Sequence, residues 1–310
     1  NCKNIYFSKK IKKIDRIIET LLMVINCKYI FLTSSSNLNK FAIFISKILK
    51  KHVYYIMHGS LSYEDEINGL LERVKQDNKY ENFIFKNVDK IFCVSEKFMD
   101  FMKKREYKYR DKFDYNYNCL DYSKLIKIPR CNNYITDILL IGGDMPRKNN
   151  KVICDAIKKI NDELSTNITC TVVGKNYEST NFFDKYDFVE YIEFLPRDKL
   201  MQLMGKSKLN ILNSSFETFG LSIIEALIIG SSILISNKVG SIGILENVRE
   251  TDIIYDTSDI EEISNKIRLI LEKPNNNRLI NSINLDVILP QNAAFNLLKK
   301  VGLNYEDYCK

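Results

Sequence analysis

Apolar and polar positions follow two patterns that alternate along the chain. Short apolar runs rich in β-branched and aromatic residues predict buried strands, and longer stretches with apolar residues three and four positions apart predict amphipathic helices. In the amino-terminal part, the patterns predict strands over 29–33, 53–57, 91–95 and 113–117, and helices over 37–51, 64–86 and 96–104.

The same alternation continues to the end of the chain. Strands that are apolar throughout and separated by helices are typical of parallel sheets covered on both faces. We therefore predict an α/β fold with two doubly wound domains. The predicted strands here are 137–141, 169–173, 189–194, 209–213, 232–236 and 252–255, and the predicted helices are 150–164, 197–206, 219–229, 259–271 and 291–301.

Charge is divided unevenly between the two parts. Residues 1–130 hold 26 Lys and Arg against 15 Asp and Glu, a formal charge of +11, whereas the remainder carries −4. The length of 310 residues also fits two domains of about 150 residues each. We predict a first domain over 1–130, a second over 131–290, and a C-terminal helix over 291–310 for which a return to the first domain is one option.

Composition narrows the class of protein. The chain is 45% hydrophobic and 27% charged, which is typical of a globular protein and excludes a disordered or collagen-like chain. Its longest uncharged apolar stretch has 12 residues, whereas a membrane-spanning helix needs about 20. The chain begins at Asn1 without a signal-peptide pattern, and we expect a fragment or trimmed chain of a cytoplasmic protein.

The cysteines indicate free thiols. The eight of them lie at least 12 positions apart and form no Cys-x-x-Cys pair, and the chain has only two histidines, so we expect no structural zinc site. Cys93, Cys154 and Cys170 lie inside apolar runs, where a thiol behaves as a small buried hydrophobic group.

Two segments concentrate basic residues. Residues 9–25 predict an amphipathic helix with lysines at its start, which suits either an anionic lipid surface at the inner face of a membrane or a helix packed on its own domain; we favour the second. Residues 103–112 interleave cations with Tyr107 and Tyr109, as readers of single-stranded nucleic acid do. One short run that also holds acidic residues favours a solvated helix end, so we expect no nucleic-acid partner.

The most informative stretch is residues 209–236. An apolar strand ends before Glu217, and a helix that is apolar on nearly every side carries Glu225 in its middle. Such a helix must be buried, and a buried carboxylate needs a partner. Glu217 lies at the carboxyl end of a strand, where open α/β sheets bind ligands, and amides near Gly220 at the helix start would suit a diphosphate.

Two interpretations of these carboxylates stay open. Their separation of eight positions corresponds to about 12 Å of helix, a span that fits hydroxyl groups at two ends of an extended ligand. The structural alternative is that Glu217 caps the helix and Glu225 pairs with a Lys or Arg of the core.

The context of the pair resembles a known signature. Glu217-x7-Glu225 within S-x-x-E-x-F-G-L-x-x-I-E-A-L-x-x-G is similar to the signature of the family 4 retaining glycosyltransferases of GT-B fold. The stretch IGGDMPRKN (141–149) resembles the family's phosphate-binding loop, VVGKN (172–176) a strand ending in glycine, and MHGS (57–60) the histidine loop of the first domain. The resemblance covers residues 29–270 and implies two Rossmann-like domains facing across a cleft, the first of them shortened.

The resemblance also implies roles for individual residues. Lys148, with Arg147, would contact the diphosphate of the donor and stabilise the departing phosphate. Glu225 would bind the ribose, and Glu217 the hydroxyl groups of the transferred sugar. His58 would approach that sugar from the first domain. Backbone at the loops and at the helix start would complete the donor site, at Gly143, Gly174, Thr218, Phe219 and Gly220.

The implied activity is transfer of a hexose from a nucleotide-diphosphate sugar to a glycan or lipid-linked acceptor, in cell-surface polysaccharide or glycoconjugate synthesis. We expect no cofactor and, since no Asp-x-Asp motif is present, metal-independent transfer. Four features depart from the family. Gly143 stands where many members have a basic residue, so Arg147 or Lys148 must supply the charge, and Cys119 replaces a glycine. The loop at 240–243 lacks a glutamate, and no opening glycine-rich unit precedes the first strand. The alternatives are a non-catalytic GT-B partner that binds glycan, and a GT-B epimerase or phosphorylase.

Overall fold

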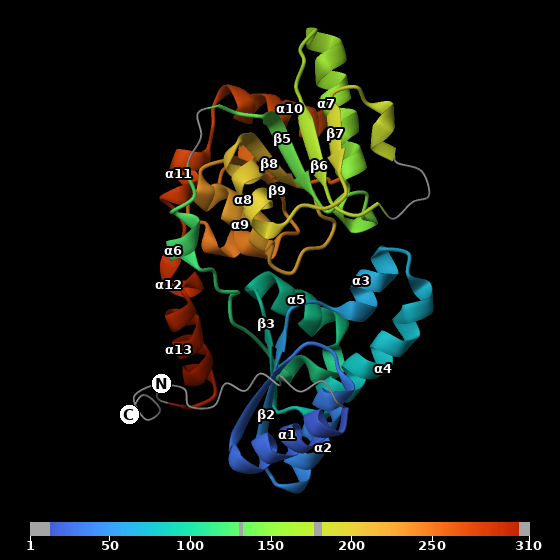
Figure 1. Ribbon diagram of the computed structural model, residues 1–310, viewed down its shortest axis with the longest axis vertical. Coiled ribbons are helices and arrows are strands. Elements are labelled where there is room, and N and C mark those ends of the chain that lie inside the picture. Colours follow the sequence, from blue (N-terminus) through green and yellow to red (C-terminus); the bar gives the residue numbers. More distant parts are fainter. Residues whose placement is uncertain (1–12, 130–132, 177–181, 304–310) are drawn as a thin grey trace. The chain divides into compact units, whose positions relative to one another are not determined.

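The structure is a computed structural model that describes residues 13–129, 133–176 and 182–303. The chain forms two compact units (Figure 1). Unit 1 comprises Asn1–Glu66, Leu70–Tyr117 and Gln291–Lys310, and unit 2 comprises Ile67–Gly69 and Asn118–Pro290. The second unit thus begins before the composition boundary at 131, which lies outside the described residues.

Four parallel strands form the described sheet of unit 1, in the order β1-β2-β3-β4. Consecutive residues Ile91, Phe92 and Cys93 of β3 are all fully buried, which requires cover on both faces of the sheet. The strands are β1 (Tyr29–Thr33), β2 (His52–Met57), β3 (Lys90–Cys93) and β4 (Phe113–Tyr115).

The helices of unit 1 correct one prediction. A single helix over 64–86 is wrong, because Gly69 adopts a left-handed φ of 77° and separates two helices. The helices are α1 (Lys13–Asn26), α2 (Asn37–Ile48), α3 (Leu61–Ile67), α4 (Leu71–Asn87), α5 (Glu96–Arg105) and α13 (Pro290–Lys300).

Helix α1 confirms the helix predicted over 9–25 from Lys13 onward; Lys9, Lys10 and Lys12 lie outside the described residues. Its apolar residues are only partly covered: Ile14 is 71% exposed and Leu22 is 54% exposed, whereas Val24 is buried. Packing on its own unit therefore covers only part of the apolar face of α1. None of the described helices is both long and apolar enough to cross a membrane.

The C-terminal helix α13 docks on unit 1 through polar contacts. The ammonium group of Lys300 donates to Oδ1 of Asp114 at 2.7 Å and to the carbonyl of Tyr115 at 2.5 Å. The Asn116 side chain donates to the carbonyl of Ala293 at 3.1 Å. Lys90 approaches Asp114 from β3 at 3.2 Å, so one carboxylate joins two strands and the helix.

The sheet of unit 2 has six parallel strands in the order β10-β9-β8-β5-β6-β7. Chain order reverses between the neighbours β5 and β8, so the loops that follow these two strands diverge at that edge of the sheet. In open α/β sheets this switch point is where ligands bind. The strands are β5 (Thr136–Ile141), β6 (Cys170–Val173), β7 (Val189–Ile192), β8 (Ser207–Leu212), β9 (Ser232–Ser236) and β10 (Ile253–Ile254).

Helices cover this sheet and bury a continuous apolar core. Every residue of α9 from Ile223 to Ile229 is buried, which confirms the buried helix predicted from its composition. Cys93, Cys154 and Cys170 are buried as predicted, whereas Cys2, Cys131 and Cys309 lie outside the described residues. The helices of unit 2 are α6 (Tyr122–Leu125), α7 (Asn150–Leu164), α8 (Arg197–Gly205), α9 (Leu221–Ile229), α10 (Ile260–Glu272), α11 (Asn276–Ile280) and α12 (Leu285–Ile288).

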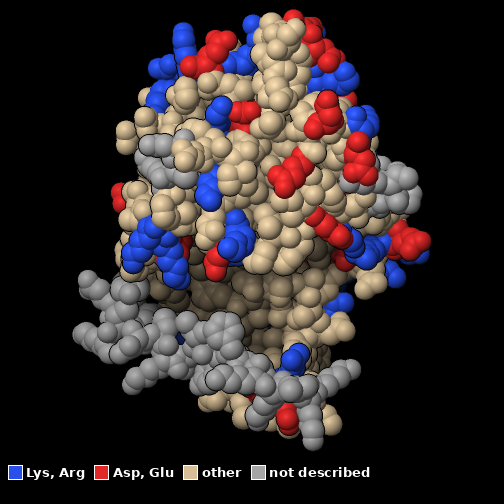
Figure 2. Space-filling model, turned by 45° about the horizontal axis from the view of Figure 1, so that its top comes forward, with Lys and Arg blue, Asp and Glu red and all other residues tan. Residues whose placement is uncertain are grey.

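The face drawn in Figure 2 carries basic and acidic side chains interspersed, without a large patch of one sign. A mixed surface of this kind gives weak long-range attraction for a polyanion.

Docking of α13 is expected to depend on pH through Asp114. Burial raises the pKa of Asp114, but the bonds from Lys300, Tyr115 and Lys90 outweigh it and leave this pKa below its ordinary value. A lowered folded-state pKa stabilises the fold above the ordinary Asp range of about 4 and loses this contribution as the pH falls through the folded-state value. Hydrogen-exchange protection of α13 should therefore decrease below about pH 4.

Asp114→Asn should lower α13 protection at neutral pH and remove most of its pH dependence. Asp111→Asn is the control, because the Asp111 side chain is 95% exposed. Equal α13 protection in Asp114→Asn and the unsubstituted protein would contradict this account.

Candidate functional site

The loop after β5 is shaped by short backbone and amide contacts. A 3₁₀ turn over Pro146–Lys148 ends at Asn149, which adopts a left-handed φ of 50°. The Asn149 side chain donates to the carbonyl of Asn213 in the loop after β8, at 3.2 Å. Asn150, at the start of α7, donates to the carbonyl of Gly143 at 2.8 Å. These contacts hold the loop against the switch point.

Gly143 and Gly174 bring the loops after β5 and β6 into backbone contact. Gly143 has φ 60°, and a Cβ there would lie 2.1 Å from the carbonyl oxygen of Lys175. A Cβ on Gly174, whose φ is 142°, would lie 2.3 Å from the nitrogen of Gly143. The Gly143 N–H donates to the carbonyl of Val173 at 3.1 Å. The geometry thus gives both glycines a loop-shaping role.

Glu217 lies in the loop after β8 and meets the two cations of the β5 loop. Nη1 of Arg147 donates to Oε2 of Glu217 at 3.1 Å, and the ammonium group of Lys148 donates to the same oxygen. The Ser215 N–H donates to the carbonyl of Arg147 at 2.9 Å, which ties the two loops together. The Gly240 N–H donates to the carbonyl of Glu217 at 3.0 Å from the other side.

This cluster is shielded from water, since the three side chains are only 12–14% exposed. Burial alone would raise the pKa of Glu217, but Lys148 and Arg147 outweigh it and lower this pKa. Glu217 is therefore ionised at neutral pH, and the cluster of one carboxylate and two cations carries a net charge of +1. It attracts anions while its own carboxylate occupies the cations.

Glu225 pairs with an arginine, as one of the two interpretations allows, but this arginine does not belong to the core. Its side chain is 7% exposed, and Nη2 of Arg197, at the start of α8, donates to its Oε1. The Arg197 side chain is 70% exposed, so the partner lies at the surface and not in the core. Burial raises the pKa of Glu225 and outweighs the lowering by Arg197. Arg197 can leave this carboxylate only where another donor replaces it, because a buried carboxylate without a partner is costly.

The start of α9 needs glycine. Gly220 adopts φ 87°, and a Cβ there would lie 2.9 Å from Val239 and 3.0 Å from Leu212. Thr218 and Phe219 before it are 8% and 1% exposed. The carbonyl of Phe219 accepts from the N–H of Ser241 at 2.8 Å, so the short helix over Gly240–Ile244 braces this segment. The structure thus fixes the backbone that leads into α9.

His58 belongs to unit 1, where it directly follows β2. Burial lowers the pKa of His58, so its imidazole is neutral at neutral pH. Within unit 2 the structure gathers the other candidates into two groups: Arg147, Lys148 and Glu217 at the switch point, and Glu225 with Arg197.

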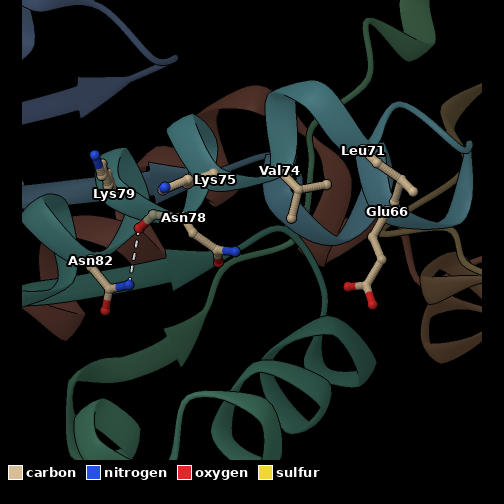
Figure 3. Close-up of a pocket in the computed structure, with 7 residues that line it drawn as sticks. All are labelled: Glu66, Leu71, Val74, Lys75, Asn78, Lys79 and Asn82. Atoms are coloured by element: carbon tan, nitrogen blue, oxygen red, sulfur yellow. Dashed lines mark hydrogen bonds between the residues drawn. The ribbon is translucent and has the colours of Figure 1, made fainter.

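The predicted residues do not line an open hollow of unit 1. That hollow, of about 810 Å³, lies in unit 1 along the solvent side of α4, where Figure 3 shows Lys75, Lys79 and two asparagines on successive turns. A smaller hollow of about 390 Å³ lies beside the amino ends of β5 and β8, next to Asp137 and Lys208. Both are separate from the cluster around Glu217.

Sequence reasoning missed three supporting residues. All three act on residues far away in the chain or on loop backbone. Arg197 and Asn150 belong to no signature, and Asn149 ends the stretch 141–149 without an assigned role. The proline before Arg197 and the two asparagines at the start of α7 were the available signals, since both mark helix starts.

The comparison with known families gives a match in unit 2, which holds the cluster of Arg147, Lys148 and Glu217. Residues 132–284 match the family of glycosyl transferases group 1. The match covers most of unit 2, including the loops after β5 and β8 and all of α9. Unit 2 is thus similar to the group 1 glycosyltransferases over these residues. A search of curated proteins finds no match to this chain.

Solved structures extend the likeness of fold to both units. HepE of Anabaena, solved with UDP and glucose, has a TM-score of 0.66 at 14% identity over 96% of this chain and 85% of its own. A UDP-forming trehalose-phosphate synthase of Burkholderia xenovorans has a TM-score of 0.66 at 8% identity over 94% and 79%. Sucrose-phosphate synthase of Thermosynechococcus elongatus has 0.60 at 15% over 96% and 77%. The chain has the α/β GT-B fold with two Rossmann-like domains, as predicted.

Gly143→Ala should destabilise unit 2 through two effects. An alanine with φ near 60° costs about 1 kcal/mol, and the added Cβ must displace the Lys175 backbone. Urea unfolding should show a loss of about 2 kcal/mol or more. Gly69→Ala is the matched control, because Gly69 has φ 77° with open space around the added Cβ. Equal losses in both variants would show that the close approach has no cost.

Glu217→Gln should tighten binding of inorganic pyrophosphate to the protein. The substitution removes the internal anion and leaves Arg147 and Lys148 for the ligand, and we expect about tenfold tighter binding by calorimetry, equivalent to about 1.4 kcal/mol. Glu225→Gln is the control, because Glu225 pairs with Arg197 instead. Unchanged or weaker binding in Glu217→Gln would show that the two cations do not form the anion site.

Proposed function

We propose that the protein is a retaining glycosyltransferase that moves a hexose from a nucleotide-diphosphate sugar to a glycan or lipid-linked acceptor. The observation that carries the proposal is the cluster of Glu217, Lys148 and Arg147, which lies at the β5/β8 switch point inside the segment that matches the group 1 family. The printed ligands of HepE, UDP and glucose, favour a donor of this class.

The proposal assigns each residue a part of the donor. Lys148 and Arg147 bind the diphosphate, Glu217 binds hydroxyl groups of the transferred sugar, and Glu225 binds the ribose after Arg197 moves away. Gly143 and Gly174 shape the loop, and the backbone at Thr218, Phe219 and Gly220 faces the phosphates. We also assign His58 of unit 1 a role at the transferred sugar.

The reaction breaks the bond between the anomeric carbon and the phosphate oxygen and forms a bond to the acceptor oxygen on the same face. The leaving diphosphate takes the proton of the acceptor hydroxyl, so no protein nucleophile is needed. Negative charge grows on the diphosphate as the bond breaks. The side chains of Arg147 and Lys148 are each only 14% exposed. Two cations held in such a shielded place stabilise that charge far better than they would in water.

The acceptor and the setting are part of the proposal. We infer synthesis of a cell-surface polysaccharide or glycoconjugate in the cytoplasm, without a metal or another cofactor. The exposed apolar residues of α1, with basic residues in the same part of the chain, favour contact with an anionic membrane at its inner face.

Lys148→Ala should abolish sugar transfer while the protein stays folded. Loss of one charged donor at a developing anion costs about 100-fold or more in kcat. Release of nucleotide from UDP-hexoses and GDP-hexoses, with and without acceptor, measures the effect. Lys158→Ala is the control, because Lys158 pairs with Asp162 on the outer side of α7 and is 56% exposed.

Transfer that survives in Lys148→Ala would refute the assigned role of the β5 loop. Absence of UDP and GDP binding at millimolar concentration in the unsubstituted protein would favour the alternative, a non-catalytic GT-B partner that binds glycan.

A further inference from the structure

Two consecutive residues of α4 hold neighbouring turns at the carboxyl edge of the unit 1 sheet. The hydroxyl of Tyr80 accepts the N–H of Ser36 at 2.9 Å, in the turn after β1. The carboxylate of Glu81 accepts the hydroxyl of Ser62 at 2.5 Å, in the segment after β2. Because β1 and β2 pair in parallel, these segments lie next to each other. Helix α4 therefore anchors two loops on the edge where α/β sheets carry their sites.

Glu81 is buried in an unusual way, since it is 5% exposed and no cation pairs with it among the described residues. Burial raises its pKa, and the hydroxyl of Ser62, the backbone N–H groups of residues 61 and 62 and the hydroxyl of Ser60 lower it. Only the bond from Ser62 has good geometry; Oε1 of Glu81 and Oγ of Ser60 have no such partner in the described chain. A buried carboxylate held this way is a poor source of stability.

The segment that Glu81 holds is the one that carries His58. Ser60 and Ser62 are fully buried, so the residues that follow His58 are held on their buried side. A second carboxylate closes over the segment: a Cβ on Gly59 would lie 2.2 Å from Oε1 of Glu64. The His58 imidazole therefore projects from a short segment whose position depends on acidic side chains behind it.

We propose that Glu81 is the positioning residue of His58: it fixes residues 58–62 through the serine hydroxyls and backbone amides and thereby sets where the imidazole lies. The effect on turnover rests on the proposed function, in which His58 acts at the transferred sugar. The effect on the position of His58 does not.

Glu81→Gln tests the positioning directly. The variant keeps the shape of the side chain but replaces one acceptor oxygen by an NH2 group, which cannot accept from a hydroxyl or an N–H. The segment should loosen and let more water reach His58, which is already exposed in part. The His58 resonance in a proton NMR titration should therefore shift, with its pKa moving up toward the ordinary value of about 6.5. The chain has only two histidines, so His52 is an internal reference.

Two controls separate positioning from a general loss of structure. Tyr80→Phe removes the hydroxyl that anchors the turn after β1, and Glu72→Gln changes an exposed carboxylate of the same helix. Neither variant should change the His58 resonance or its titration. If circular dichroism shows that Glu81→Gln is unfolded, Ser62→Ala removes the one well-formed bond and should give the same shift. A His58 titration that is unchanged in the folded variants would overturn the proposal.

Turnover gives the second readout. In Glu81→Gln we expect kcat for transfer to fall about tenfold, with the Kd for UDP within twofold of the unsubstituted protein, because the nucleotide is assigned to unit 2. An equal loss of UDP affinity would indicate a general structural defect and overturn the proposal. If the unsubstituted protein transfers no sugar, the proposed function fails, and the His58 titration still decides the role of Glu81.

Discussion

A carboxylate that is nearly withdrawn from water, shared by two cations of a neighbouring loop, is the constraint on which unit 2 depends. Glu217 is tolerable in that place only while Arg147 and Lys148 are close, because a lone buried charge costs several kcal/mol. The cations in turn stay close only if the β5 loop keeps its path. That path requires backbone contact between the loops after β5 and β6, which glycine alone permits. The path of the β5 loop therefore determines whether the charge of Glu217 is compensated.

The same three side chains have to satisfy two demands. Without a ligand, the two cations compensate the charge of the buried Glu217 carboxylate. In the proposed function, a bound diphosphate would share the cations among more oxygens, and Glu217 would lose part of its pairing while it gains hydroxyl groups of a sugar. A ligand that carries both groups compensates for the change better than phosphate alone. Selectivity for an intact sugar nucleotide over its product can arise from this exchange.

Sequence pattern was enough for most of the framework, because fully buried parallel strands leave an apolar run that few other structures produce. Such runs located every strand of both sheets within a few residues. The break between α3 and α4 was missed because the helical period continues across Gly69, and only its backbone conformation interrupts the helix. The return of α13 to unit 1 depends on a lysine meeting a carboxylate almost two hundred positions away, which no local pattern records.

The residues of the site also fall into those that the sequence pattern indicates and those that it does not. Lys148, Glu217 and Glu225 stand out in the sequence because charged residues interrupt apolar or glycine-containing stretches. Arg197 and Glu81 do not stand out, because their importance lies in what they approach in space. Gly143 was assigned to ligand contact, and its close approach to the Lys175 backbone adds an architectural role.

The docking of α13 has a consequence for synthesis of the chain. Nearly all of unit 2 is one continuous segment, so it can become compact as soon as residue 290 has left the ribosome. Most of unit 1 is synthesised earlier, but α13 leaves the ribosome only after the whole of unit 2. The domain made first is therefore completed last, and until then Asp114 has only Lys90 as its cationic partner from this group.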